Sequence, residues 1–133
     1  KFQEVIDDAN VKPASIKRVI FCSGKIYYEL LETQKNNAKG DVAIVRVEQL
    51  YPTPVEQMEA VYSKYKNAED AVWVQEEPEN MGAWPYLLRR LRKTSFSQMD
   101  VISRKESSST ATGYAKQHAN QQAYIIATAF EIS

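Results

Sequence analysis

The sequence is poor in the residues that build metal sites and disulfides. It holds one cysteine, Cys22, and one histidine, His118, among 133 residues. A single cysteine cannot form an internal disulfide, and no CxxC or Cys/His spacing surrounds it. We therefore predict no metal site, a reducing compartment, and a Cys22 side chain that is a small buried hydrophobe.

An excess of charge of either sign is also missing. Lys plus Arg and Asp plus Glu each number 17, which argues against partners such as nucleic acid or an anionic membrane. No apolar run approaches the roughly 20 residues that span a bilayer. The apolar share of 44% and the charged share of 26% are those of an ordinary globular domain with one core.

What the sequence does contain is an alternation of strand-like and helix-like segments. Short apolar runs predict buried strands at 18–22, 42–47, 71–74 and 99–103. Periodic segments predict helices from residue 26, from residue 54, over 86–93 and over 114–130. Strands joined by helices of this length require crossovers, so the predicted fold is α/β with a largely parallel sheet.

The helix after "YPTP" carries the most complete start signal. Thr53 is predicted to be its N-cap, with Pro54 at the first helical position and Glu56 completing a capping box. Its buried stripe is predicted to consist of Val55, Met58, Tyr62 and Tyr65.

The turn "CSGK" ends the first predicted strand and opens a helix. It lacks the GxxxxG frame of a P-loop and the GxGxxG of a dinucleotide fold. A helix N-terminus still attracts anions, and Lys25 and Arg46 converge on one anion if their strands are neighbours. The alternative is a plain turn whose lysine and arginine only pair with carboxylates. Arg104 and the serines at 107–109 are a second candidate for binding a phosphate. The alternative is a polar loop without a ligand.

The remaining unusual residues favour structure over catalysis. Glu76 and Glu77 are consecutive in an extended segment, so they point in opposite directions and cannot flank one bond. Asn80, Gly82 and Trp84 predict a shaped turn that buries an indole. His118 lies on a helical face without a nucleophile at a recognisable spacing, and "RRLRK" indicates a solvated face or a subunit contact. No catalytic residue is predicted.

Four strings are more specific than these patterns. "RVIFCSGKIYYELLE", "DVAIVRVEQLYPTP", "VWVQEEPENMGAWPY" and "TGYAKQHANQQ" resemble, in order and spacing, the C-terminal domain of the 2-oxoglutarate dehydrogenase family. The resemblance implies a three-layer, transketolase C-terminal-like domain: a mostly parallel five-stranded sheet with one antiparallel strand and helices on both faces. Residues 1–15, whose apolar Phe2, Val5 and Ile6 lack an obvious local partner, are expected to be a lead-in from a longer chain, and 16–133 the domain.

The resemblance also implies where the chemistry lies. In the family, thiamine diphosphate and Mg²⁺ bind in preceding domains across a homodimer interface, and the enzyme decarboxylates 2-oxoglutarate in the tricarboxylic acid cycle and passes succinyl to a lipoyl carrier. The implied partners are those domains, a second subunit and the dihydrolipoyl succinyltransferase component. The implied compartment is the bacterial cytoplasm or the mitochondrial matrix. This chain alone is expected to be catalytically silent, as a structural and dimerisation domain.

An alternative function is an allosteric module for acetyl-CoA or AMP. The family pattern carries over onto Ser23, Lys25 and Arg46, and onto Arg104 as a further basic position. The loop after Arg104 reads "KESSST" where the family often has a proline and less charge, which affects any ligand contact through it. Thr53 stands where the family often has phenylalanine.

Overall fold

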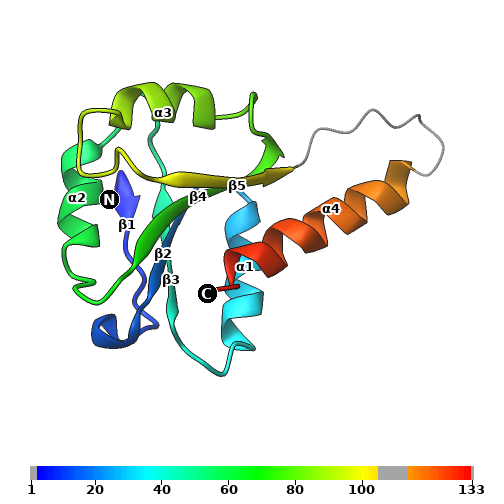
Figure 1. The fold of residues 1–133 in the computed structure, drawn as a ribbon, viewed down its shortest axis with the longest axis horizontal. Helices are drawn as coiled ribbons and strands as arrows, with labels where there is room; N and C mark the ends of the chain where they lie inside the picture. Colours follow the sequence, from blue (N-terminus) through cyan, green and yellow to red (C-terminus); the bar gives the residue numbers. More distant parts are fainter. Residues whose placement is uncertain (1–2, 105–113, 133) are drawn as a thin grey trace.

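The computed structural model describes residues 3–104 and 114–132, and of residues 114–118 it describes the backbone only. A five-stranded sheet forms its centre, with strand order β1-β3-β2-β4-β5 (Figure 1). The strands are β1 (Val5–Ile6), β2 (Arg18–Cys22), β3 (Val42–Val47), β4 (Asp70–Pro78) and β5 (Asp100–Arg104). Strand β1 runs antiparallel to β3, and the other neighbours are parallel. The three-layer α/β fold with one antiparallel strand is confirmed.

Helices cover both faces of this sheet. They are α1 (Ile26–Lys35), α2 (Val55–Tyr62), α3 (Trp84–Leu91) and α4 (Tyr114–Ala129), and a short 3-10 turn, η1 (Pro13–Ser15), precedes β2. No helix in the described ranges is long and apolar enough to cross a membrane.

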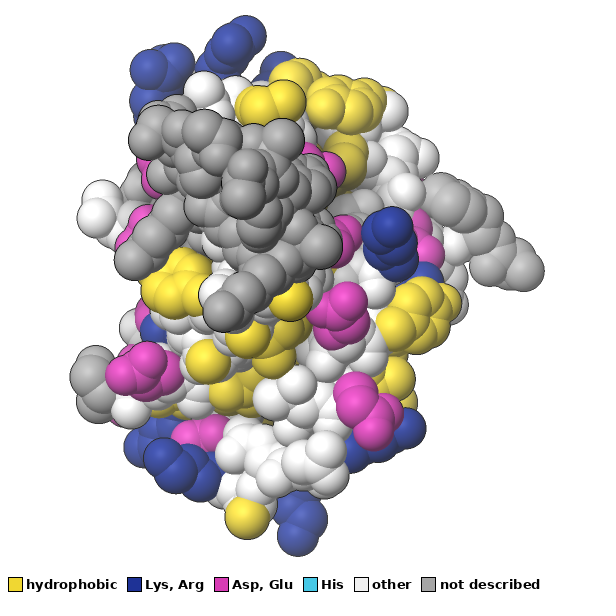
Figure 2. Space-filling view, turned by 90° about the vertical axis from the view of Figure 1, so that its right-hand side faces the viewer, with side chains coloured by type: hydrophobic (Ala, Val, Ile, Leu, Met, Phe, Trp, Pro, Cys, Tyr) yellow, Lys and Arg dark blue, Asp and Glu magenta, His cyan; other side chains and the backbone are white. Residues whose placement is uncertain are grey.

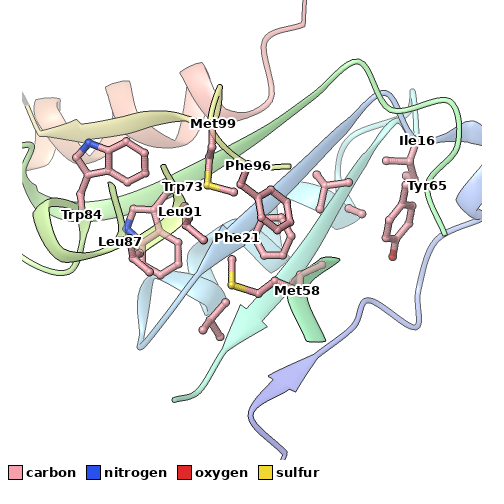
Figure 3. Packing of buried hydrophobic residues seen from close by; sticks show 14 residues of the cluster. Ile16, Phe21, Met58, Tyr65, Trp73, Trp84, Leu87, Leu91, Phe96 and Met99 are labelled. Carbon is pink, nitrogen blue, oxygen red and sulfur yellow. The ribbon is translucent and has the colours of Figure 1, made fainter. Parts of the chain in front are cut away.

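Alternation along the strands divides the buried side chains into two clusters. In β2, Val19 and Phe21 belong to the cluster under α2 and α3, whereas Ile20 and Cys22 belong to the cluster under α1 and α4. This is the period-two pattern of a strand that is buried on both faces. Figure 3 shows the first cluster, in which Phe21 meets Phe96 edge-on with ring centroids 5.4 Å apart.

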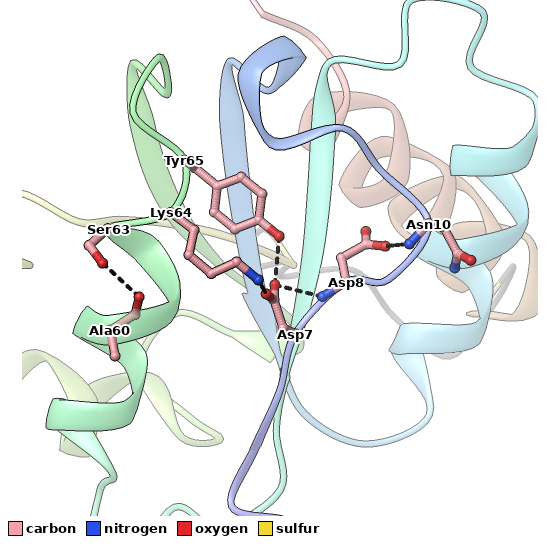
Figure 4. A network of polar contacts seen from close by, with 7 residues as sticks. All are labelled: Asp7, Asp8, Asn10, Ala60, Ser63, Lys64 and Tyr65. Atoms are coloured by element: carbon pink, nitrogen blue, oxygen red, sulfur yellow. Dashed lines mark hydrogen bonds and ion pairs between the residues drawn. The ribbon is translucent and has the colours of Figure 1, made fainter.

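The segment before β2 is fastened to both helical layers. Asp7 accepts hydrogen bonds from Tyr65 and Lys64, which follow α2 (Figure 4). Asp8 accepts hydrogen bonds from Gln34 of α1 at 2.7 Å and from the backbone N–H of Ile44 at 2.9 Å. The backbone N–H of Ile44 lies on β3 beyond the end of β1, where no strand residue can accept from it. The carboxylate of Asp8 supplies the missing acceptor.

The predicted lead-in therefore contributes to the sheet. Val5 pairs with Val47 and packs against the cluster under α2 and α3, which gives it the local partner that the sequence did not reveal. The boundary between residues 15 and 16 stays a prediction.

The predicted start of α2 is wrong in detail. The helix begins at Val55, its N-cap is Pro54, and no side chain caps it. The hydroxyl of Thr53 instead donates to the carbonyl of Leu50 at 2.8 Å, a local bond to the backbone three residues earlier that competes with capping. The predicted burial of Met58 and Tyr65 is confirmed, with exposed fractions of 0% and 3%.

Candidate functional site at the carboxyl edge of the sheet

The residues of the predicted anion site lie on neighbouring strands. Cys22 at the end of β2 stands opposite Arg46 of β3 in the parallel ladder. Ser23 and Lys25 follow directly, and Lys25 is the N-cap residue of α1. The turn between them depends on Gly24, whose φ of +79° favours glycine. The structure thus brings Ser23, Lys25 and Arg46 to one edge of the sheet.

Arg46 is already engaged by this edge. Its Nη2 donates to Glu48 Oε1 at 2.8 Å, and its guanidinium carbon lies 4.5 Å from the ring centroid of Tyr27 and 5.8 Å from that of Tyr28. Stacking and pairing of this kind hold a guanidinium in place. The buried Nε of Arg46, however, has no hydrogen-bond partner in the described part of the chain.

The charges around Arg46 also act on the buried thiol beside it. Burial raises the pKa of Cys22 to about 12, with Arg46 opposing the rise and Glu48 adding to it. The side chain is fully buried and free of any disulfide. The prediction that Cys22 is a buried hydrophobe is confirmed.

Arg104 lies apart from this group. Strands β2 and β4 separate β3 from β5, so three interstrand steps, or about 14 Å of sheet, lie between the backbones of Arg46 and Arg104. The Nε of Arg104 donates to Gln121 on α4. The serines at 107–109 lie outside the described residues, as does the side chain of His118.

The loop after β4 is organised by a residue that sequence reasoning missed. Gln75 is 4% exposed, and its Oε1 accepts from the indole N–H of Trp73 at 3.0 Å and the backbone N–H of Trp84 at 3.1 Å. Its amide nitrogen donates to the carbonyl oxygens of Glu77, Pro78 and Met81. The available signal was a glutamine at the end of an otherwise apolar strand, where a buried amide needs several partners.

This network buries Trp84 to 5% exposure, as the sequence predicted. Gly82 has φ +67°, and a Cβ added there would lie 3.0 Å from the Glu77 carboxylate. Glu76 accepts a hydrogen bond from Gln122 of α4 at 3.1 Å, while Glu77 is exposed. The two glutamates therefore serve different layers and do not form an acid/base pair.

The basic residues of "RRLRK" occupy the last turn of α3 and the positions after it. Arg89, Arg90 and Arg92 are exposed, and the guanidinium of Arg90 lies 5.9 Å from the ring centroid of Tyr86. Within the described residues, no group of three or more His, Cys, Asp or Glu side chains is placed to hold a metal ion.

Known proteins resemble the chain from end to end. Residues 1–130 match the family model described as 2-oxoglutarate dehydrogenase C-terminal. An oxoglutarate dehydrogenase of Buchnera aphidicola is 43% identical over 136 residues, covering 100% of this chain and 15% of that protein. A 2-oxoglutarate dehydrogenase E1/E2 component of Corynebacterium glutamicum is 42% identical over 134 residues, covering 98% and 11%.

A 2-oxoadipate dehydrogenase complex component E1 of Danio rerio is 39% identical over 131 residues, covering 97% of this chain and 14% of that protein. The chain therefore spans a small part of the length of the relatives it matches. The fold, the ordered motifs and the match over residues 1–130 agree, and the chain belongs to the family of 2-oxoglutarate dehydrogenase C-terminal domains.

Proposed function

We propose that this chain is the C-terminal structural and dimerisation domain of a 2-oxoglutarate dehydrogenase E1 component. The observation that carries the proposal is the match of residues 1–130 to that domain family. The parent enzyme decarboxylates 2-oxoglutarate and transfers succinyl to a lipoyl carrier on the dihydrolipoyl succinyltransferase component, in the cytoplasm of a bacterium or the mitochondrial matrix. Residues 16–133 form most of the domain in this proposal, and residues 1–15, which add strand β1 to its sheet, connect it to the preceding part of the parent.

The cofactor belongs to the preceding domains in this proposal. Thiamine diphosphate and Mg²⁺ supply the carbanion stabilisation there. The polar side chains of this chain support the proposal because they make structural hydrogen bonds. Those of Asp7, Asp8, Gln75 and Glu76 connect strands to helices and loops. Because a relative acts on 2-oxoadipate by name, the substrate is proposed to be chosen outside this domain.

A chimera tests the proposal. This chain replaces the matching C-terminal segment in the Buchnera relative, and decarboxylation of 2-oxoglutarate and of 2-oxoadipate is measured. We expect the chimera to recover activity that the same relative truncated before the domain lacks, with the substrate preference of the host. The isolated chain should be inactive. Decarboxylation by the isolated chain, or a folded chimera no better than the truncation, would contradict the proposal.

We further propose that Ser23, Lys25 and Arg46 form an effector site for the phosphates of acetyl-CoA or AMP. The proposal is argued from one observation: the Nε of Arg46, beside the first turn of α1, has no hydrogen-bond partner among the described residues. Glu48 competes for the same guanidinium. Arg104 joins this site only through a ligand that reaches across β2 and β4.

Calorimetry with acetyl-CoA and AMP, on this chain and on the chimera, tests the effector site. Arg46→Ala and Lys25→Ala should each cost about 1.5–3 kcal/mol of binding free energy, the value of one charge-assisted hydrogen bond. Arg89→Ala is the control, because it removes an equal charge from the exposed end of α3. Binding that is absent, or that all three variants weaken equally, would overturn this role.

A further inference from the structure

The outer edge of β5 has no partner strand among the described residues. Strand β5 ends the order of the sheet and pairs only with β4. The backbone N–H of Val101 donates to the side chain of its neighbour Asp100 at 2.8 Å. This contact indicates that Val101, and by alternation Ser103, direct their backbone groups away from β4. An edge of this kind is a template for another strand.

A groove runs along this open edge. Residues of β5 line it together with Trp84, Pro85 and Leu88 of α3 and with Tyr124 and Thr128 of α4. Leu88 and Tyr124 are large apolar side chains that are 51% and 41% exposed. Figure 2 views the molecule from the right-hand side of Figure 1 and shows hydrophobic side chains exposed between acidic and basic ones. Large apolar side chains of both helical layers are therefore partly exposed beside this edge strand.

The charges of β5 are self-complementary. The strand reads Asp-Val-Ile-Ser-Arg, with Asp100 and Arg104 placed symmetrically about Ile102. We propose that β5 pairs antiparallel with β5 of a second copy of this chain, around a two-fold axis at Ile102, to give one continuous sheet. Asp100 of each copy then faces Arg104 of the other, so the pairing creates two ion pairs.

The hydrogen-bond pattern selects the same register. On pairing, the N–H of Val101 exchanges its bond to Asp100 for the carbonyl of Ser103 in the second copy. Val101 and Ser103 then form hydrogen-bonded pairs with Ser103 and Val101 of that copy. Ile102 with its own counterpart, and Asp100 with Arg104, become the closer non-hydrogen-bonded pairs. A shift by two residues in either direction places Ile102 opposite Asp100 or opposite Arg104, and at least one charge loses its partner. Charge and backbone pattern thus agree on one arrangement.

The side chains of this pairing lie in one layer. Ile102 packs in the cluster with Ile125 of α4, so Asp100 and Arg104 share the α4 side of the sheet by alternation. Gln121 of α4 accepts from Arg104 and holds its guanidinium on that side. The competing reading is that the two charges only protect a solvent-exposed edge of a monomer. This inference deepens, and rests on, the dimerisation role proposed above.

Charge reversal tests the interface by sedimentation equilibrium. Asp100→Arg or Arg104→Asp alone turns two attractions into two repulsions and should raise the dimer dissociation constant at least roughly fivefold. The double variant Asp100→Arg/Arg104→Asp restores both pairs and should dimerise like the unchanged chain. Arg92→Asp, on an exposed residue outside the strand, controls for net charge. A chain that stays monomeric at all concentrations, or singles that dimerise unchanged, would overturn the proposal.

Cross-linking tests the register. In the proposed pairing the Cα atoms of residue 100 and of residue 104 in the second copy lie about 4.5 Å apart, within reach of a disulfide. The two residues 100 lie about 13 Å apart across the axis. Asp100→Cys/Arg104→Cys should therefore form an oxidised dimer, whereas either single cysteine should not; Cys22 is buried and does not compete. A double variant that forms no dimer, or singles that cross-link equally, would refute this register. Neither result depends on decarboxylation, so a failure here leaves the chimera result standing.

Discussion

The phenol of Tyr65 donates a 2.6 Å hydrogen bond to the carboxylate of Asp7 across 58 positions of the sequence. Lys64 bonds to the other oxygen of the same carboxylate. The two bonds join the segment after β1 to the residues that follow α2, so one carboxylate links the N-terminal edge of the sheet to a helical layer (Figure 4).

Removing the charge of Asp7 should destabilise the fold. A hydrogen bond to an ionised group contributes about 1.5–3 kcal/mol, so Asp7→Asn should lower the free energy of unfolding by that amount, and Tyr65→Phe by about 1–2 kcal/mol. Both are measured by urea unfolding, and the double variant should show strong coupling because Asp7→Asn weakens the contact that Tyr65→Phe removes. Glu69→Gln is the control, since its ion pair with Lys17 is exposed at 3.7 Å and should be worth little. Additive losses would contradict a shared contact.

The same contact should make stability depend on pH at both extremes. Burial alone would raise the pKa of Asp7, but hydrogen bonds from Lys64 and Tyr65 hold it below its ordinary value of 3.8. Its stabilisation is complete above that value and is lost as the pH falls through the lower folded pKa. Burial, and then the hydrogen bond to Asp7, raise the pKa of Tyr65 above its ordinary value of 10. The stabilisation from the protonated phenol is therefore present below pH 10 and is lost as the pH rises further.

Unfolding curves at a series of pH values check both signs. The stability advantage of the unchanged chain over Asp7→Asn should shrink as the pH falls below 4, and its advantage over Tyr65→Phe should shrink above pH 10. An advantage over Asp7→Asn that grows in acid would show that the folded carboxyl prefers its proton.

Apolar runs and the spacing of apolar residues predicted much of this fold, because both depend on residues that are close in the sequence. The run at 18–22 and the alternation in "DVAIVRV" gave strands whose burial in both layers follows from side-chain direction alone. Strand β1 is two residues long and too short for any pattern; the family resemblance implied one antiparallel strand but did not place it at these residues. The contacts of Asp7, Asp8 and Gln75 were not predicted, since each pairs a polar side chain with groups that only the folded chain brings close.

For the candidate site, too, the placement of residues on the sheet was predicted and their side-chain contacts were not. That Ser23, Lys25 and Arg46 share one edge followed from the adjacency of parallel strands. That Glu48 and Tyr27 already engage Arg46 depends on side-chain conformations that spacing does not encode. The separation of Arg104 depends on the strand order, which places β5 at the far end of the sheet.

Gln75 should be a large single contributor to the loop after β4. Gln75→Leu keeps the volume but leaves the indole N–H of Trp73, the N–H of Trp84 and three carbonyls without their partner. Each buried unsatisfied group costs about 1–3 kcal/mol, so we expect a loss of more than about 2 kcal/mol in urea unfolding and a shift in tryptophan fluorescence. Gln57→Leu, on the exposed side of α2, is the matched control. Equal losses from the two variants would contradict this role.

The two turn glycines should differ although their backbones are alike. Gly82 and Gly40 have φ of +67° and +59°, so alanine at either position costs about 1–2 kcal/mol of backbone strain. Only at Gly82 would the new Cβ also meet the Glu77 side chain, at 3.0 Å, whereas Gly40 faces open space. Gly82→Ala should therefore lower the free energy of unfolding more than Gly40→Ala does. Indistinguishable unfolding curves would show that Glu77 moves aside freely.

The thiol of Cys22 should report the opening of the core. It is fully buried, and burial raises its pKa to about 12, so the native state offers neither access nor thiolate at pH 8. Labelling with a disulfide reagent should then be at least roughly a thousandfold slower than for the fully unfolded chain in denaturant, because it proceeds through opened molecules. An exposed cysteine introduced by Ser97→Cys is the internal control and should react at once. If the opening is global, Asp7→Asn should speed the labelling of Cys22 by about ten- to a hundredfold, because the variant lowers the free energy of unfolding. Labelling of Cys22 as fast as that of the control cysteine would contradict its burial.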